Sequence, residues 1–216
     1  MKKKKLNILF EDKHLIIVNK PSGMPTIKSD NYRNNLYSEV WDYLHKKNQK
    51  LFVVHRLDAD TSGLVVFAKS EKVKSNLQDN WDNVLREYYC VVHGSTLDSG
   101  VIKSYLKETK TLYTYSSDDK KNGKYAETHY ERVSDNKNFS LLKVDIKTGR
   151  KNQIRVHMKD NNTPIVGDKK YGKKDGYRNM LLLASHVFFV HPITRERIDI
   201  KLDIPELYLR IVKKKE

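Results

Sequence analysis

The stretch His55-Arg56-Leu57-Asp58-Ala59-Asp60-Thr61-Ser62-Gly63 decides how this chain is interpreted. It lies between two short apolar runs, residues 51–54 and 64–68, which are rich in Val and Phe and are typical of buried strands. The stretch between them is longer than a simple hairpin turn, and it carries two carboxylates, a guanidinium and an imidazole. Polar loops held by rigid apolar strands often carry binding and catalytic residues, so we expect a functional site here.

The composition is that of a basic globular protein. The 216 residues are 38% hydrophobic and 32% charged, and 42 basic against 27 acidic residues give a net charge of +15. Terminal lysines 2–5 and 213–215 contribute seven of these charges, so the rest of the chain still carries about +8. Such a charge indicates a polyanionic partner, with RNA, DNA and acidic membranes as candidates.

Several features favour a cytoplasmic protein without a metal or a membrane anchor. The single cysteine, Cys90, excludes an internal disulfide framework and a cysteine metal cluster. The first residues lack the apolar run of a signal peptide, and no apolar stretch approaches the length of a membrane helix. His55, His157 and His191 are scattered and lack ligand-type partners at helical spacing, so we expect no metal site.

Apolar periodicity predicts an α+β class with a largely antiparallel mixed sheet, flanking helices and loops around a central cleft. Residues 86–94 are expected to form a strand with Tyr88, Cys90 and Val92 on one face. The chain neither alternates strands and helices nor carries a glycine-rich phosphate loop, which disfavours Rossmann and P-loop folds. We expect one catalytic domain, residues 1–216, with mobile basic tails at 1–6 and 212–216.

Helices are expected in four places. Leu36, Val40 and Leu44 are spaced four apart and predict a helix over residues 36–47, and a second helix is expected over 71–81. Thr148 is the expected N-cap of a third helix that carries residues 153–158. A short C-terminal helix is expected to start at Pro205.

Taken singly, each candidate site residue also has an ordinary structural interpretation. Asp58 is a nucleophile or base, or else the cap of a turn, and Asp60 is a possible second carboxylate of a glycosidase-type pair. Tyr88 is a general acid or base, a stacking platform for a base, or a core tyrosine. Arg56 suits a phosphate contact or a surface ion pair, and Arg150 with Arg155 suits an anion site or a solvated helix.

The order of five segments along the chain favours the functional interpretation of these residues over the structural one. Residues 55–69 closely resemble the signature of the RluA family of RNA pseudouridine synthases. Four further segments resemble the same family in the same order, and together they cover nearly the whole chain: residues 7–23, 86–94, 148–172 and 182–194. Two positions depart from the family's usual pattern, Asn152 and Leu183, where relatives often carry His. The small RNA-binding domain that many relatives carry before the catalytic domain is not expected here.

The resemblance implies an activity and a set of site residues. Family members detach uracil from its ribose in a flipped-out nucleotide, rotate it and rejoin it through carbon, without cofactor or metal. Asp58 matches the catalytic aspartate, Tyr88 the active-site tyrosine, and Arg155 the arginine that we expect to keep Asp58 ionised. RNA contacts are expected from a set around these residues: His55, Arg56, Arg150, Lys151, Asn152 and Gln153. Asp60 is then structural or exposed, and Thr61, Ser62 and Gly63 form the turn that aims Asp58.

The expected protein is therefore a monomeric, cytoplasmic enzyme that converts specific uridines of ribosomal RNA, transfer RNA or both to pseudouridine. Two rival interpretations keep part of the pattern. One is a non-catalytic RNA-binding or ribosome-assembly factor with the same fold. The other is a glycoside hydrolase that uses Asp58 and Asp60, which a strongly basic surface does not favour.

Overall fold

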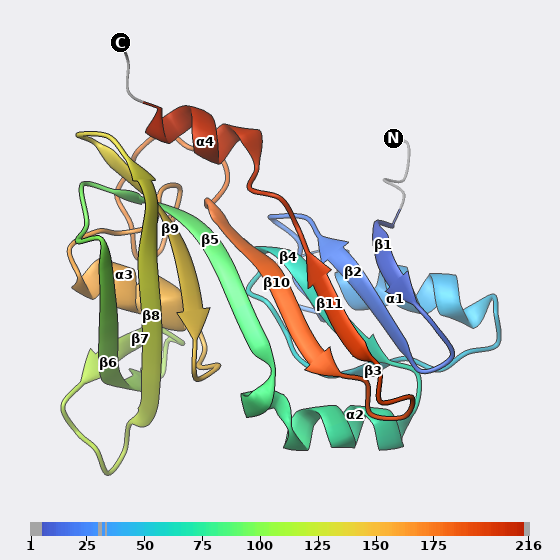
Figure 1. Ribbon diagram of the computed structural model, residues 1–216. Helices are drawn as coiled ribbons and strands as arrows, with labels where there is room; N and C mark the ends of the chain where they lie inside the picture. The colour runs from blue at the N-terminus through green and yellow to red at the C-terminus, as the bar shows by residue number, and fades with distance from the viewer. Residues whose placement is uncertain (1–5, 30–31, 33, 214–216) are drawn as a thin grey trace. The chain divides into compact units, whose positions relative to one another are not determined.

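The computed structural model describes residues 6–29, 32 and 34–213, and their contacts divide the chain into two compact units (Figure 1). Unit 1 comprises Met1–Val84 and His186–Leu202, and unit 2 comprises Leu85–Ser185 and Asp203–Glu216. Strand β10 (Leu182–Val190) contributes residues to both units.

Unit 1 has the strand order β1-β2-β4-β10, with β3 paired to β4 and β11 paired to β10. The pairs β1–β2, β2–β4, β3–β4 and β10–β11 are antiparallel. The strands of this unit besides β10 are β1 (Ile8–Glu11), β2 (Leu15–Lys20), β3 (Phe52–Val53), β4 (Ser62–Ala68) and β11 (Arg197–Lys201). Strand β2 lies between β1 and β4, and its residues Leu15 to Val18 are completely buried, as expected for a continuous apolar run. Ile17 of β2 pairs with Val66 of β4, so the apolar residues 15–18 pair in register with the apolar run at residues 64–68.

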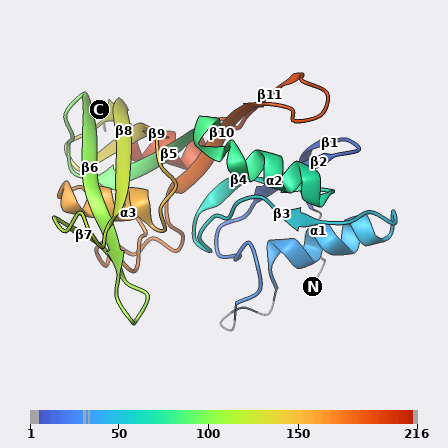
Figure 2. The same cartoon turned by 90° about the horizontal axis from the view of Figure 1, so that it is seen from below.

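Two helices pack in unit 1 (Figure 2). Helix α1 (Leu36–His45) starts at Asn35, whose side chain accepts a hydrogen bond from the Ser38 N–H at 2.9 Å. Helix α2 (Glu71–Asp79) starts at Ser70, and its Val73 and Leu77 join the core formed by β2 and β4. A 3-10 turn, η1 (Trp81–Asn83), follows, so Trp81 lies beyond the helix that was expected to contain it.

Unit 2 has the strand order β10-β5-β9-β8-β6-β7, and its pairs from β5 to β7 are antiparallel. These strands are β5 (Leu85–His93), β6 (Ser99–Glu108), β7 (Thr114–Ser117), β8 (Lys124–Asp135) and β9 (Phe139–Ile146). Cys90 and Val92 of β5 are buried in one core cluster and Tyr88 packs against it, which confirms the predicted face. Ile154 and Met158 of helix α3 (Gln153–Asp160) complete this core.

The start of α3 differs from the prediction. The helix begins at Gln153, and its N-cap is Asn152 in the left-handed region at φ 55°, so Thr148 is not the cap. The Thr148 hydroxyl instead donates to Gln153 Oε1 at 2.7 Å and accepts from the Glu127 N–H at 3.0 Å. Asn tolerates the left-handed region better than most residues do, which explains how the chain turns sharply into this helix.

The last helix is α4 (Glu206–Val212), which follows Pro205 as predicted. Val212, which the prediction placed in a mobile tail, ends this helix and is buried. Most of the two predicted tails, residues 1–5 and 214–216, lies outside the described residues. In the part of the chain that the structure describes, no helix has the length and apolarity needed to span a bilayer.

Candidate active site

The loop that carries Asp58 is held from both sides by the segment after β2. Thr26 clamps Leu57, because its hydroxyl donates to the Leu57 carbonyl at 2.9 Å and accepts from the Leu57 N–H at 3.1 Å. On the other side of Asp58, the Gly23 N–H donates to the Ala59 carbonyl at 2.9 Å. The backbone of Asp58 is therefore fixed through its two neighbours, which is what a catalytic group needs from its surroundings.

Lys20 is the main organiser of this loop, although no local sequence pattern marks it as a site residue. The residue is completely buried at the end of β2. Its ammonium group donates to three carbonyl oxygens, those of Pro21 at 3.1 Å, Met24 at 2.6 Å and Ala59 at 2.9 Å. Burial lowers the pKa of Lys20 to about 8, although the negative charges of Asp58 and Asp60 oppose that shift. A cation thus lies under the Asp58 loop.

The rest of the stretch is mainly structural. The Thr61 N–H donates to the Asp58 carbonyl at 3.1 Å, which closes a turn over residues 58–61, and the Thr61 side chain is buried. Ser62 and Gly63 were predicted to belong to the turn, but they already lie in β4, so that part of the prediction is wrong. The Asp60 carbonyl accepts from the Ser22 hydroxyl at 2.7 Å, which ties this end of the loop to the same segment after β2.

His55 and Arg56 differ in their surroundings. The His55 ring accepts a hydrogen bond from the Val66 N–H at its Nε2 (3.0 Å) and stacks on Trp81 at a centroid distance of 4.5 Å. These contacts fix the start of the loop against β4 and η1. Arg56 is exposed. An RNA contact by either residue stays a prediction.

In unit 2, Arg155 of α3 is fixed by a buried ion pair. Its Nε and Nη2 donate to the two carboxylate oxygens of Asp168, each at 2.8 Å, and its Nη1 donates to Asn152 Oδ1 at 2.9 Å. The guanidinium also lies 5.0 Å from the centroid of the Tyr171 ring. Three of its five N–H donors are thereby directed at Asp168 and Asn152, so the plane and orientation of the guanidinium are defined.

Asp168 is a second site residue that no local sequence pattern marks. Burial by itself would raise its pKa, but the hydrogen bonds and positive charge of Arg155, with the N–H groups of Tyr171 and Lys170, outweigh burial and hold the pKa below its ordinary value. The carboxylate is therefore ionised over the whole physiological range. Asn152, one of the two departures from the family pattern, contributes by receiving a hydrogen bond from Arg155.

The turn before α3 is organised by Gln153. Its Oε1 accepts from the Thr148 hydroxyl and from the Arg150 N–H at 3.0 Å, and its Nε2 donates to the Glu127 carbonyl and the Thr128 hydroxyl, both at 2.9 Å. Gln153 and Asn152 are both buried and make these contacts inside the protein. Arg150 and Lys151 are exposed, so of the four residues predicted here to contact RNA they have the accessible side chains.

The predicted site residues are thus divided between the two units. Asp58, with Arg56 and His55, belongs to unit 1, while Tyr88 on β5 and Arg155 on α3 belong to unit 2. Unit 2 brings Arg155 together with Asn152 and Asp168. That Asp58, Tyr88 and Arg155 act together stays a prediction.

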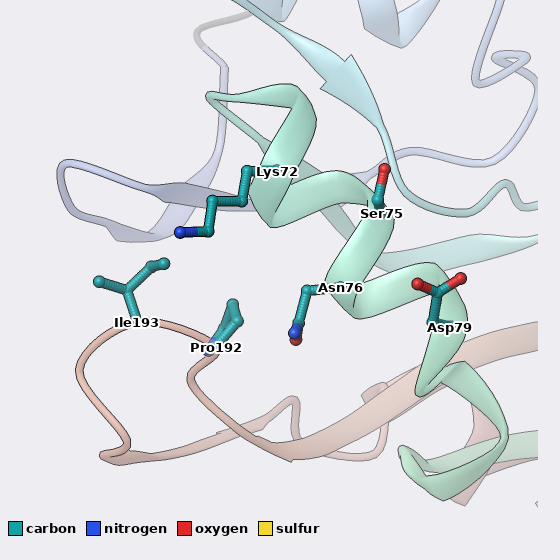
Figure 3. Close-up of a pocket in the computed structure, with 6 residues that line it drawn as sticks. All are labelled: Lys72, Ser75, Asn76, Asp79, Pro192 and Ile193. Atoms are coloured by element: carbon teal, nitrogen blue, oxygen red, sulfur yellow. The ribbon is translucent and has the colours of Figure 1, made fainter.

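A separate pocket lies in unit 1 between α2 and the turn that joins β10 to β11 (Figure 3). Its volume is about 280 Å³, and it is lined by Lys72, Ser75, Asn76, Asp79, Pro192 and Ile193. In Figure 3, Lys72, Ser75, Asn76 and Asp79 lie along α2, and Pro192 and Ile193 lie on the turn. None of the six is a predicted site residue, so the pocket is not the candidate active site.

Comparison with known proteins gives the class to which this fold and these residues correspond. Residues 14–160 match the family model described as RNA pseudouridylate synthase. The chain is 32% identical to ribosomal large subunit pseudouridine synthase D of Zymomonas mobilis over 93% of its own length and 70% of that relative. It is 30% identical to ribosomal large subunit pseudouridine synthase C of Rickettsia typhi, over 94% of the chain and 69% of that relative.

The fold is also that of solved structures of this class. The structure titled human RNA pseudouridylate synthase domain containing 4 superposes with a TM-score of 0.77 at 21% identity, over 94% of this chain and 90% of that one. The chain therefore belongs to the RNA pseudouridylate synthase family, in its RluA-type branch. It is an RNA pseudouridine synthase, an isomerase that modifies RNA.

Proposed function

We propose that this enzyme isomerises specific uridines of ribosomal RNA, transfer RNA or both, and that Asp58 is the catalytic carboxylate. The observation that carries the proposal is the fixation of the Asp58 loop by Lys20, Thr26 and Gly23 in a chain of this family. The carboxylate acts either as a nucleophile on the ribose or the base, or as a base that takes a proton from the ribose. Each route needs an ionised group that is held in place.

Two residues of unit 2 are proposed to act on the same uridine. Arg155 is proposed to be the cationic partner of the Asp58 carboxylate, and Asp168 and Asn152 fix the orientation of its guanidinium. Tyr88 stacks on the target ring and relays a proton. The support for these roles is the match of both residues to the family pattern, together with the fixed guanidinium in unit 2.

The uridine must leave its stack before a side chain can reach the glycosidic bond. Extruding a nucleotide costs about a few kcal/mol, and the cost is lowest in loops and bulges. Exposed Arg56, next to the Asp58 loop, is proposed to hold the place of the extruded nucleotide. Contacts between the basic surface and phosphates offset part of the cost, so RNA affinity is expected to fall as salt rises.

Ribosomal RNA is the favoured substrate because the two bacterial relatives are named for the large ribosomal subunit. We further propose that the protein works as a monomer in the cytoplasm and needs neither metal nor cofactor. Its surplus of basic residues, +15 in net charge, suits an RNA substrate.

Release of tritium from RNA labelled at uracil C5 tests this proposal, because forming the new carbon–carbon bond expels the hydrogen at C5. Unmodified transcripts of large-subunit ribosomal RNA and of transfer RNA are incubated with excess enzyme in a single turnover. The parent protein is expected to release tritium, Asp58→Asn is expected to release none, and Asp60→Asn serves as the matched carboxylate control. Release by Asp58→Asn at the parental rate would contradict the proposal, and loss of release in Asp60→Asn alone would move the role to Asp60.

A further inference from the structure

The loop over residues 167–179, here called the basic loop, joins α3 to β10 in unit 2. It contains five basic and two acidic residues. Such a mixture in a sequence usually forms local ion pairs on a solvated surface. The fold arranges these charges differently, because it separates the acidic from the basic side chains.

Both acidic side chains of the basic loop are turned inward. Asp168 is 1% exposed and is held by Arg155 and by the N–H groups of Lys170 and Tyr171, at 2.9 and 3.0 Å. Asp175 accepts from the Gly167 N–H at 2.7 Å and from the Tyr177 N–H at 3.1 Å, and it contacts His93 Nε2 at 2.8 Å. The two carboxylates are thus engaged by Arg155, His93 and backbone N–H groups of the loop, and not by the exposed cations of the loop.

Four of the five cations of the loop are exposed, and their side chains are here called its outer face: Lys169, Lys173, Lys174 and Arg178. Within the described residues, none of these four forms an ion pair with a carboxylate. Lys170, by contrast, ties the loop to the segment before β7. Its ammonium group donates to the Leu112 carbonyl at 2.7 Å and lies 5.5 Å from the rings of Tyr113 and Tyr171.

The basic loop is also fixed in shape. Gly167 has a φ of 76°, and a Cβ at this position would lie 2.1 Å from the Asn179 carbonyl oxygen, so the two ends of the loop are in close contact. The Leu181 N–H donates to the Val166 carbonyl at 2.9 Å just outside the loop, and the Gly172 N–H donates to the Asp168 carbonyl at 2.9 Å within it. A fixed array of charges loses less entropy on binding than mobile side chains on a mobile loop.

We infer that the outer face of the basic loop binds the phosphate backbone of the RNA substrate, away from the reacting uridine. This inference rests on the proposed function. Lysine ammonium groups act as point charges and attract phosphates without reading bases, so the loop contributes affinity and orientation and leaves sequence recognition to other residues. An acidic membrane is a weaker match, because membrane-surface binding also uses exposed apolar side chains. In this loop Tyr171 is buried and Tyr177 lies edge-on to Phe139.

The test compares two quadruple variants of equal charge. The first replaces the four outer cations of the loop: Lys169→Gln, Lys173→Gln, Lys174→Gln and Arg178→Gln. The control removes four exposed lysines of unit 1: Lys13→Gln, Lys46→Gln, Lys50→Gln and Lys72→Gln. Binding to a fluorescent stem–loop RNA with a uridine-rich loop is measured over a range of salt concentrations, with vesicles containing phosphatidylserine as the second probe.

The loop variant is expected to bind RNA at least ~10-fold more weakly at low salt and to lose about 3 units from the slope of log affinity against log salt, since each phosphate contact contributes about 0.7 to 0.9. The control should lose less than about one unit. Equal losses in the two variants, or an unchanged slope in the loop variant, would overturn the inference. So would a loop-dependent affinity for the vesicles that equals the affinity for RNA.

Tritium release separates this inference from the proposed function. The loop variant is expected to raise KM while keeping the single-turnover rate at saturating RNA, because none of its four changes touches a proposed catalytic residue. A parent protein that releases no tritium but binds RNA through the loop would contradict the proposed function and leave the loop assignment intact. An active parent whose loop variant binds RNA as tightly would overturn the loop assignment alone.

Discussion

The ammonium group of Lys20 lies 2.9 Å from the carbonyl oxygen of Ala59, the residue that follows Asp58. Lys20 ends β2, and its register partner on β4 is Gly63, at the far end of the same polar stretch. One buried cation therefore links the strand, the segment after it and the loop with the proposed catalytic carboxylate. Its position makes Lys20 a positioning residue for Asp58.

Replacement of Lys20 by Met is expected to weaken both the fold and the activity. The variant leaves the Pro21 and Met24 carbonyls without their donor, and we expect it to lower the free energy of unfolding by about 2 to 4 kcal/mol. Single-turnover tritium release should slow, with little change in RNA affinity. Lys13→Met, at an exposed position near the start of β2, is the control. Parental stability and rate in Lys20→Met would refute the positioning role.

The lowered pKa of Lys20 predicts a distinct dependence on alkaline pH. The pKa is about 8 in the folded protein and 10.5 for an ordinary solvated lysine, so between these values the unfolded chain binds more protons. The Lys20 contribution to stability therefore rises as pH increases from about 8 to 10.5 and is constant below that window. Urea unfolding at pH 7.5 and 10 should show the gap between parent and Lys20→Met widening by about 2 to 3 kcal/mol. A constant gap would count against a buried cation at this position.

We expect a conservative substitution in the Arg155–Asp168 pair to destabilise the protein strongly. Asp168→Asn keeps the shape but removes the charge opposite a buried guanidinium, so we expect stability to fall by about 3 kcal/mol or more. Arg155→Lys keeps the charge but loses the two-pronged contact, and catalysis should fall more than RNA binding does. Thermal unfolding and tritium release check these outcomes, with Glu71→Gln as an exposed control for the loss of one carboxylate. Unchanged behaviour in both variants would exclude a structural role for the pair.

We expect His157 to make the free energy of unfolding fall as the pH is lowered. It is completely buried on α3, with Nδ1 2.8 Å from the Thr128 hydroxyl and Nε2 3.0 Å from the Ser104 hydroxyl. Burial lowers its pKa to about 4 from the ordinary value of 6.5, although the negative charge of Asp160 opposes this shift. The unfolded chain therefore binds the extra proton between these two values. The His157 contribution is complete above pH 6.5 and is lost progressively as pH falls toward 4, by up to about 3 kcal/mol.

Urea unfolding of the parent and of His157→Gln between pH 4 and 7 checks this expectation. The variant should be less stable at pH 7 and should show a shallower decline on acidification. His45→Gln, at an exposed position at the end of α1, is the control that removes an imidazole from solvent. If the parent and His157→Gln decline in parallel, His157 does not set the acid slope.

Much of the fold follows from local patterns in the sequence. The apolar run at residues 15–18 becomes the buried strand β2, and the alternation of Tyr88, Cys90 and Val92 places them on the predicted face. Such patterns report burial directly, because a strand or helix must cover its apolar face. The helix spacing of Leu36, Val40 and Leu44 is confirmed for the same reason.

The polar supports of the site were not accessible to the same reasoning. A lysine in a sequence is ordinarily exposed, so nothing local marks Lys20 as the buried donor to a loop 39 residues away. Asp168 lies 13 residues beyond Arg155 on a different segment, and only the fold brings them together. Thr148 failed as a helix cap because its hydroxyl bonds Gln153 and Glu127, which are contacts of the folded turn.

The most direct test of the central claim is to map pseudouridines by chemical modification and sequencing in cells that lack this gene and carry either the parent gene or its Asp58→Asn form. Immunoblotting establishes that the two proteins accumulate equally. The parent is expected to restore specific pseudouridines in ribosomal or transfer RNA, and Asp58→Asn is expected to restore none while still binding RNA. Restoration of the same positions by Asp58→Asn would contradict the assignment of Asp58 as the catalytic carboxylate.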